Sequence, residues 1–390
     1  MQISHRAEVL SFCQELLRHP SPSGQEEGVA ACVEREMTML GYDAVQRDAL
    51  GSVVGLLRGA RPGPTVLVDA HMDTAPITSP GAWRYDPASG AVSEGCIWGR
   101  GSVDVKGSLA AAVVAAGSLP RSRLAGALVV AATVGGEMVE GLALAQVLRE
   151  HPADVVVVCA PTGLRLGLGH RGRAALVVAA EGVAAHSSLP GRGVNAVYLM
   201  VEAIARLRAL EPHEDDLLGK SSMELVGISS APEPGASMVP HLCTALFDRR
   251  LVRGETAAGV LAEARLALEG MRGIAVEYHR PRFSSYTGYV AVADDFHPAW
   301  AIPPSSEVVR LALRGLRSVG QPAGACYIAC CTSGAASAAQ GGRPTILYGA
   351  GEVDGAHVVN EALPLEQLDA AFQGYRGLIL ALTRSEGAAG

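Results

Sequence analysis

Apolar residues recur at two different spacings along the first part of the chain. Residues 7–17 carry them at helical spacing, and Ser23 with Glu26 forms a capping-box pattern that predicts a second helix ending at Gly41. Short β-rich runs follow with helical stretches between them: strands are predicted at 52–57, 65–68, 127–133 and 154–159, and helices at 107–117 and 142–150. Continuous apolar strands that alternate with helices predict an α/β sheet covered on both faces.

The pattern changes near Arg173. The next elements are predicted in the order strand, helix, strand, strand, helix, strand, which is the order of a ferredoxin-like split βαβ unit. The strands are expected at 174–180, 223–228, 243–250 and 274–279, and the helices at 194–207 and 255–268. The first pattern then resumes, with helices at 305–316 and 365–383 and a strand at 344–347. We therefore expect an α/β domain made of 1–172 and 283–390, with a small α+β domain, 173–282, inserted into it.

Composition narrows the class of protein. The chain has 390 residues, of which 49% are apolar and 18% charged, so a disordered chain is excluded. The 32 basic residues against 39 acidic ones give a net charge of −7, which argues against nucleic acid or an anionic membrane as a partner. No apolar run approaches the roughly 20 residues of a membrane helix. The polar start lacks the layout of a secretion signal, and the eight cysteines are scattered without a CxxC pair, so we expect a cytoplasmic protein.

Metal-binding residue types lie at the ends of predicted strands or in the loops that follow them. His71 and Asp73 end an apolar strand two residues apart, so they share a face. Asp104 lies in a Gly-rich turn before a helix, Glu137 lies between a strand and a helix, and His357 lies in a Gly-rich loop. Each alone has an ordinary explanation, such as a surface pair, a helix cap or a solvated histidine. Together they can converge at the carboxyl edge of one sheet, where histidine and carboxylate suit zinc or a similar ion.

With these residues in view, the chain resembles the zinc amidohydrolases that include acetylornithine deacetylase, succinyl-diaminopimelate desuccinylase, aminoacylase and glutamate carboxypeptidase. The resemblance runs from Ser21 to Glu361. It rests on segments that occur in the family's order: HMD at 71–73, GRGSVDVKG at 99–107, HRGR at 170–173, HSSLPGRGVNA at 186–196, DRR at 248–250 and the loop of His357. The resemblance implies a zinc-peptidase-like catalytic domain, an inserted dimerisation (lid) domain, a homodimer formed through that domain, and one or two Zn²⁺, with Co²⁺ or Mn²⁺ as substitutes.

The resemblance also implies roles for residues. His71 would bind one metal, and Asp104, through a cis peptide to Val105, would bridge two. Glu137 and His357 would bind the other metal.

Three further residues would support the reaction. Asp73 would orient His71. His186 would reach the site of the partner subunit and stabilise the developing oxyanion. Arg250 would hold a substrate carboxylate, although a structural salt bridge is the alternative.

Two positions depart from the family pattern. The family has two adjacent glutamates where this chain has Gly136 and Glu137, and the first of them is the general base that takes a proton from metal-bound water. The family also has an acidic ligand before Pro161, where this chain has Ala160. A positioned base is worth about 10²–10⁴-fold in rate, so its loss puts ordinary amide hydrolysis in question.

Nearby groups could compensate. Cys159 neighbours the lost ligand, but alternation along a strand favours its burial in the core. Cys330 and Cys331 lie in a loop that the family places near the site, and core packing is again the alternative. Glu140 could act as a displaced base, or it could be a carboxylate at a helix start.

Three functions remain open. The first is a metal-dependent enzyme acting on an amide or similar C–N bond of a small amino-acid-derived substrate that carries a carboxylate. The second is a non-hydrolytic enzyme on the same scaffold, which performs ring closure, acyl transfer or elimination in a biosynthetic pathway without an activated water. The third is a catalytically inactive binding homologue.

Overall fold

The computed structural model describes residues 2–232 and 237–384. The chain divides into two compact units, which are described separately. Unit 1 contains residues up to His170 together with 282–291 and those from 301 on, and unit 2 contains 171–281 and 292–300. The segment 292–300 was expected in the larger domain, but its strand β17 (Phe296–His297) pairs with β9 (Gly172–Glu181) of unit 2.

Unit 1 is built on a mixed sheet. Within the described residues this sheet has nine strands, in the order β1-β2-β6-β3-β7-β20-β8-β18, with β19 also paired to β8. The strands are β1 (Ala44–Arg47), β2 (Val53–Arg58), β3 (Arg61–His71), β6 (Ala125–Thr133), β7 (Val155–Cys159), β8 (Leu166–His170), β18 (Trp300–Ala301), β19 (Ala325–Ile328) and β20 (Thr345–Tyr348). The central strands β6, β7 and β20 are buried along almost their whole length, because both faces of the sheet are covered.

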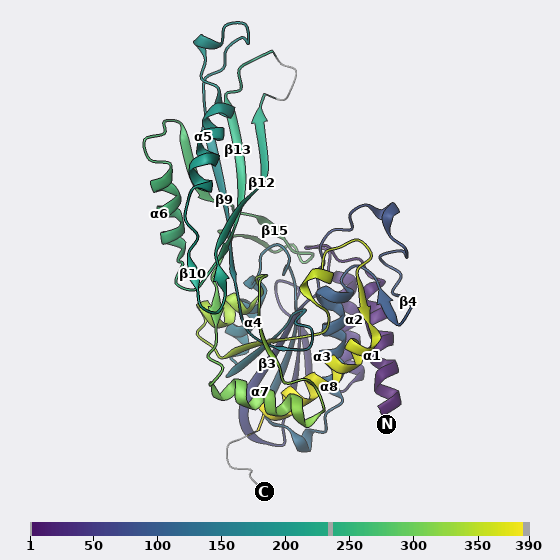
Figure 1. Cartoon of the computed structure of the whole chain (residues 1–390). Helices are drawn as coiled ribbons and strands as arrows, with labels where there is room; N and C mark the ends of the chain where they lie inside the picture. The colour runs from purple at the N-terminus through teal and green to yellow at the C-terminus, as the bar shows by residue number, and fades with distance from the viewer. Residues whose placement is uncertain (1, 233–236, 385–390) are drawn as a thin grey trace. The chain divides into compact units, whose positions relative to one another are not determined.

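Helices pack around this sheet (Figure 1). They are α1 (Gln2–Leu17), α2 (Glu27–Met39), α3 (Gly107–Gly117), α4 (Leu142–Glu150), α7 (Glu307–Ser318) and α8 (Leu365–Leu382). The helix α3 is buried from end to end and packs against α1, α2 and α8. Its alanine-rich sequence suits this position, because small side chains let neighbouring helices approach closely. A separate sheet in unit 1 joins β4 (Ala91–Ser93), β5 (Cys96–Trp98) and β21 (Ala362–Pro364).

Unit 2 confirms the predicted ferredoxin-like order. Its main strands are β9 (Gly172–Glu181), β12 (Ser222–Ala231), β13 (Leu242–Leu251) and β14 (Ile274–Tyr278), and its helices are α5 (Ala196–Arg208) and α6 (Ala257–Ala267). The antiparallel sheet has the order β12-β13-β9-β14, and α5 and α6 pack beside each other on it (Figure 1). The alternating burial along β13 matches a sheet with one covered face. A short pair, β10 (Glu214–Asp215) with β11 (Gly219–Lys220), also belongs to unit 2. Another short pair, β15 (Arg282–Ser284) with β16 (Val290–Val292), lies in unit 1 except for its last residue.

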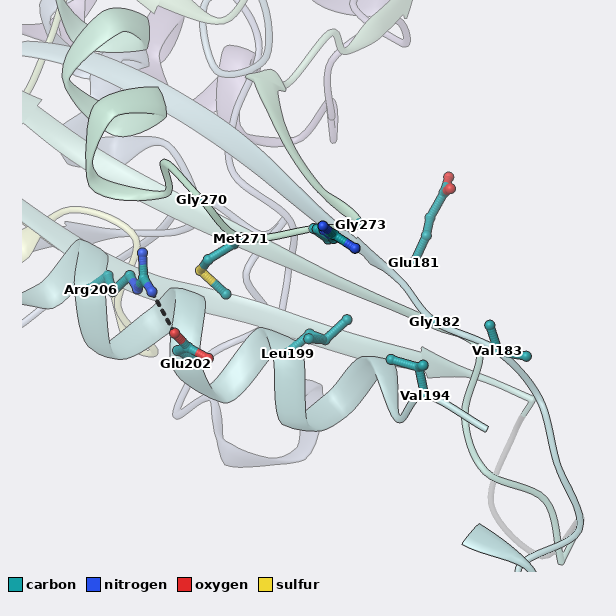
Figure 2. A pocket seen from close by; sticks show the side chains of 11 residues that line it. Glu181, Gly182, Val183, Val194, Leu199, Glu202, Arg206, Gly270, Met271 and Gly273 are labelled. Carbon is teal, nitrogen blue, oxygen red and sulfur yellow. Dashed lines mark hydrogen bonds and ion pairs between the residues drawn. The ribbon is translucent and has the colours of Figure 1, made fainter. Parts of the chain in front are cut away.

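Unit 2 also holds a cavity of about 380 Å³. Residues from the end of β9, from α5 and from the turn at 270–273 line it, and Glu202 pairs with Arg206 at its edge (Figure 2). None of these lining residues belongs to the predicted site.

The predicted elements are confirmed with shifts of a few residues at their ends, and α3 and α4 match their predicted bounds. The capping box is wrong. The residue that precedes α2 is Glu26, without a side-chain cap, and the Ser23 hydroxyl donates instead to Asp73 at 2.6 Å. No helix among the described residues is long and apolar enough to span a membrane. None of the eight cysteines, all within the described residues, forms a disulfide.

Candidate metal centre

The parallel pairing of β3 and β6 brings two of the predicted segments to one edge of the sheet. His71, the last residue of β3, is in register with Thr133, the last residue of β6. The chain that follows each strand therefore leaves the sheet at the same place. This geometry puts His71 and Asp73 next to the loop that carries Glu137, as the strand pattern predicted.

Asp104 reaches the same edge from an irregular turn, 102–106, before α3. The peptide between Asp104 and Val105 is cis, as the family resemblance implied. The buried carboxylate of Glu361 holds this turn, because it accepts from the backbone N–H groups of Val103 at 2.9 Å and Asp104 at 3.2 Å. Arg100 donates to the other oxygen of Glu361 at 2.6 Å, and this pair is almost completely buried.

The four predicted metal ligands lie together in unit 1. His71 Nε2 is 3.2 Å from Asp104 Oδ1, and His357 Nε2 is 3.4 Å from Asp104 Oδ2. His357 Nε2 is also 3.0 Å from Glu137 Oε1. One ligand atom from each of His71, Asp104 and Glu137 lies within 4.8 Å of the other two. Two imidazoles and two carboxylates at these separations offer the donor set of zinc, so the residues present fit a divalent cation.

Asp73 is fully buried behind His71 and organises the neighbouring loop. Its carboxylate lies 3.4 Å from His71 Nδ1, which also contacts the Asp73 carbonyl oxygen at 2.9 Å. The same carboxylate accepts from the backbone N–H groups of Gly136 at 2.8 Å and Glu137 at 2.9 Å. Asp73 thus fixes both the imidazole ring and the backbone that carries Glu137.

The carboxylates at this centre produce a negative electrostatic potential, which favours positively charged groups. Burial would raise the pKa of Asp104, but the two histidines outweigh it and hold that pKa below its usual value. Burial likewise opposes a charge on His71, yet its bonds to Asp104 and Asp73 raise the pKa of His71 well above the usual value. Bonds to Asp104 and Glu137 raise the pKa of His357 to about 10. The same negative field that holds protons on the imidazoles would attract a metal cation, which competes with those protons.

The two departures from the family pattern differ in their surroundings. A Cβ atom at Gly136 would lie 2.6 Å from Cβ of His71 and 2.7 Å from its Cγ, so the histidine fills the space of the missing side chain. Ala160 follows β7 and is buried, and its N–H donates to the Tyr348 carbonyl at 3.2 Å. Neither position offers a proton-transfer group or a ligand.

The possible substitutes are placed as follows. Cys159 belongs to the apolar core of unit 1, and burial raises the pKa of its thiol to about 12. Cys330 and Cys331 are half-buried, and Cys331 Sγ lies 3.8 Å from the Thr332 carbonyl oxygen. Glu140 is half-buried in the loop before α4. The group of potential metal ligands around Asp104 includes none of these four residues.

His186 and Arg250 belong to unit 2. The exposed His186 ring accepts from the backbone N–H of Ser188 at 3.2 Å and contacts its hydroxyl at 2.7 Å through Nδ1, which leaves Nε2 for other partners. Arg250 on β13 pairs with Asp248, with 2.8 Å between Nε and Oδ1, and its side chain is 35% exposed. Since the two units are described separately, the roles of both residues stay predictions.

Several residues that support the centre had no predicted role. Arg100, Lys106 and Glu361 all lie inside the motifs quoted for the family resemblance, so a signal for them was present. Lys106 is a buried lysine whose Nζ donates to the carbonyl oxygens of Leu16 and His19, and nothing in the local pattern reveals such long-range partners. Burial lowers the pKa of Lys106 to about 7.

Comparisons with known proteins agree with this geometry. The model of peptidase family M20/M25/M40 matches residues 67–381. The chain belongs to this family. It is 30% identical over 369 residues to the uncharacterized protein YgeY of Escherichia coli, covering 92% of this chain and 90% of that one. It is 28% identical over 254 residues to a succinyl-diaminopimelate desuccinylase of Cereibacter sphaeroides, covering 62% of this chain and 67% of that enzyme.

Solved structures share the fold of the family. A metallo-carboxypeptidase from Sulfolobus solfataricus has a TM-score of 0.75 at 17% identity and covers 96% of this chain and 99% of its own. A di-peptidase from Saccharomyces cerevisiae has a TM-score of 0.77 at 14% identity, with 99% and 98% coverage. The predicted family, fold class and class of metal-dependent hydrolase-family enzyme are thereby confirmed.

Proposed function

We propose that this protein is a metal-dependent enzyme acting on an amide or similar C–N bond of a small amino-acid-derived substrate. The observation that carries the proposal is the gathering of His71, Asp104, Glu137 and His357 at one edge of the sheet. These side chains are partly exposed, His357 by about half, and they contact one another through their charged groups, which is typical of ligands rather than of core residues.

Zinc is the proposed cation, held by Asp104, Glu137 and His357, with His71 as a further ligand. Bound there, a divalent ion polarises a carbonyl and lowers the pKa of water. The chain's own residues prepare the site. Asp73 keeps the His71 ring in place, and the buried pair of Arg100 and Glu361 holds the turn of Asp104.

Unit 2 would supply the remaining functions. Arg250 would hold a substrate carboxylate, since about a third of its side chain stays exposed while its guanidinium pairs with Asp248. His186, with Nε2 free of the contacts to Ser188, would stabilise a developing oxyanion in the site of a second copy. This role requires a homodimer formed through the inserted domain.

Gly136 favours a second candidate, a non-hydrolytic enzyme of a biosynthetic pathway. A family-type base at 136 is absent, and the His71 ring occupies its space. A Lewis acid with well-placed carboxylates can still orient an intermediate for ring closure, acyl transfer or elimination. An inactive binding homologue remains the third candidate, and it accounts less well for the presence of all four ligands.

Zinc analysis of variants tests the centre. Glu137→Gln should lose zinc that the parent chain retains, because a carboxylate ligand becomes a neutral amide, whereas the neighbouring Glu140→Gln should retain it. A parent chain that binds no zinc at this centre after incubation with excess metal would overturn both enzyme hypotheses.

Activity then separates the two enzymes. The zinc- or cobalt-loaded parent is assayed against N-acyl amino acids, with Glu137→Gln as the blank. Hydrolysis that disappears in Glu137→Gln supports the first candidate. No hydrolysis by the parent, together with hydrolysis by the double variant Gly136→Glu with Ala160→Glu, supports the second.

A further inference from the structure

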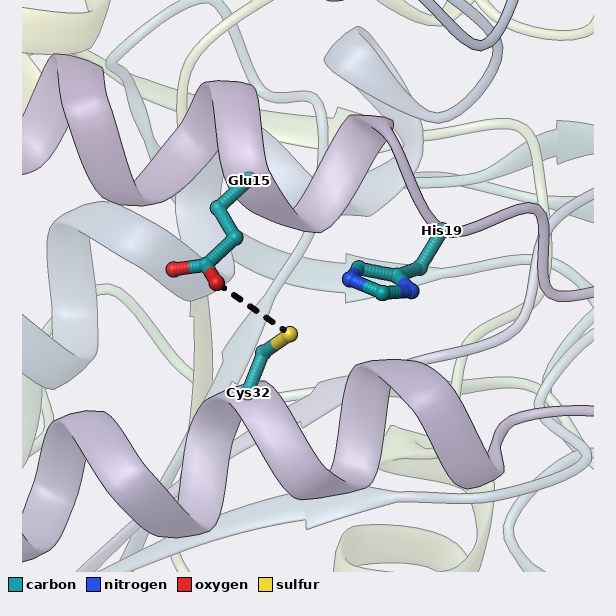
Figure 3. A group of neighbouring side chains, drawn as sticks. All are labelled: Glu15, His19 and Cys32. Carbon is teal, nitrogen blue, oxygen red and sulfur yellow. Dashed lines mark hydrogen bonds between the residues drawn. The ribbon is translucent and has the colours of Figure 1, made fainter.

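A second group of potential metal ligands lies in unit 1 at the contact between α1 and α2. Glu15 is in the last turn of α1, His19 follows the end of that helix, and Cys32 is in α2. One ligand atom from each lies within 4.8 Å of the other two, and Cys32 Sγ is 3.8 Å from Glu15 Oε1. Figure 3 shows the His19 ring pointing toward the other two side chains. This group shares no residue with the candidate centre around Asp104.

The position of the His19 ring depends on a glycine in the facing helix. Gly28 lies in the first turn of α2, and a Cβ atom there would be 2.9 Å from His19 Nδ1. Glycine lowers the intrinsic stability of a helix relative to alanine. Its presence opposite His19 leaves room for the ring to lie against the helix and face Glu15 and Cys32.

The three side chains differ in type, and this combination is selective. Thiolate, imidazole and carboxylate are all ligands of zinc, while magnesium and calcium prefer oxygen alone. Burial and the charge of Glu15 raise the pKa of the Cys32 thiol, so a metal would displace a proton from it. Arg35 pairs with Oε1 of Glu15, the same oxygen that Cys32 Sγ contacts, and it also interacts with Cys32. Its side chain is 48% exposed, so a metal bound between Glu15 and Cys32 would displace Arg35 toward solvent or leave it on the second oxygen of Glu15.

A comparable group in unit 2 fails this test. His213, Glu255 and Glu263 also lie within reach of one another. However, Arg249 donates to both glutamates, at 2.6 Å each, and is itself 4% exposed. A buried guanidinium already supplies the positive charge there, so no metal is inferred.

We propose that Glu15, His19 and Cys32 form a zinc site separate from the candidate catalytic centre, with water as the fourth ligand. The ion would join the end of α1 to α2. The carbonyl oxygens of Leu16 and His19, at that same end of α1, accept from Lys106, two residues after Asp104. The site would therefore stiffen the support of the Asp104 turn without touching the reacting groups.

Cobalt provides a readout that the catalytic centre cannot produce. A thiolate bound to Co²⁺ gives a charge-transfer absorption in the near ultraviolet, whereas the four ligands of the candidate centre contain no sulfur. Titration of the metal-free full chain with Co²⁺ should produce this band, and Cys32→Ser should abolish it. Cys96→Ser is the matched control, because Cys96 is half-buried on β5 and belongs to no group of potential ligands among the described residues.

Two more variants keep the test decisive. Gly28→Ala should weaken metal binding at this site by about tenfold or more, since the new methyl displaces the His19 ring, while helix propensity alone predicts no loss of stability. Glu137→Gln should keep the band although it loses metal at the catalytic centre, which separates the two proposals. The absence of a band in the parent, or its persistence in Cys32→Ser, would overturn the proposed site.

Discussion

Replacing Glu26 tests the electrostatics of the loop behind the metal centre. Glu26 is fully buried just before α2, and its Oε1 accepts from the backbone N–H of Gly135 at 3.0 Å. Burial, and next the charge of Asp73, raise the pKa of Glu26 from 4.5 to about 7. Glu26→Gln replaces the acid by a neutral side chain of the same shape.

The sign of the effect follows from proton binding. Between about pH 4.5 and 7 the folded chain holds a proton on Glu26 that the unfolded chain has released, so rising pH destabilises the parent. The variant lacks this penalty. At about 1.4 kcal/mol per pKa unit, the free energy of unfolding of Glu26→Gln should rise relative to the parent by roughly 2–3 kcal/mol between about pH 5 and about pH 8.

Urea unfolding at several pH values, in the presence of a chelator, measures this difference. Glu27→Gln is the control, because Glu27 makes the same charge change at an exposed neighbouring position. The difference in free energy of unfolding between Glu27→Gln and the parent should stay nearly constant over the same pH range. A difference in free energy of unfolding between Glu26→Gln and the parent that also stayed constant with pH would contradict this expectation. Burial would then not raise the pKa of Glu26.

Three other changes have definite expected outcomes. Glu361→Gln leaves the buried charge of Arg100 unpaired and should lower the free energy of unfolding, measured by urea titration, by about 3–5 kcal/mol. Glu94→Gln is the control, because it breaks an exposed ion pair with Arg84 and should lower the same free energy by less than about 1 kcal/mol. Gly136→Ala should weaken zinc binding in a competition titration far less than Glu137→Gln does, because its methyl group displaces only His71, the further ligand beside Asp104, Glu137 and His357. Phe247→Ala in the core of unit 2 should cost about 3–5 kcal/mol, measured by thermal and urea unfolding.

The sequence predicted elements well wherever a regular apolar pattern determined them. The helix α3 is almost entirely apolar between two glycines, so its sequence pattern allows only a buried helix with these bounds. Short strands such as β4 and β21 were missed, since three residues carry too little periodicity and pair through partners far apart in sequence. The capping box failed because Ser23 and Glu26 have tertiary partners, Asp73 and Gly135, that local spacing does not reveal.

The candidate site likewise has a part that the sequence predicts and a part that it does not. Its donor residues could be selected from sequence, since ligands need particular residue types at strand ends. The contacts that support them could not be predicted, because Arg100 and Glu361, although each lies in a quoted motif, form their buried ion pair across 261 residues of sequence. The close contact between His71 and Gly136 could not be predicted either, because the sequence shows that position 136 lacks a side chain but not which residue fills that space.

The two departures from the family pattern affect the same half of the centre. His357 contacts both Asp104 and Glu137, so a cation on that side keeps three ligands. On the side of His71, the acidic ligand expected at position 160 is replaced by alanine. The one proposed ligand that His71 contacts is Asp104, with 3.2 Å between Nε2 and Oδ1. The base missing at Gly136 would have stood against the same histidine. We therefore expect this centre to hold one tightly bound zinc on the side of His357, with His71 free to contact the substrate or to close the coordination shell.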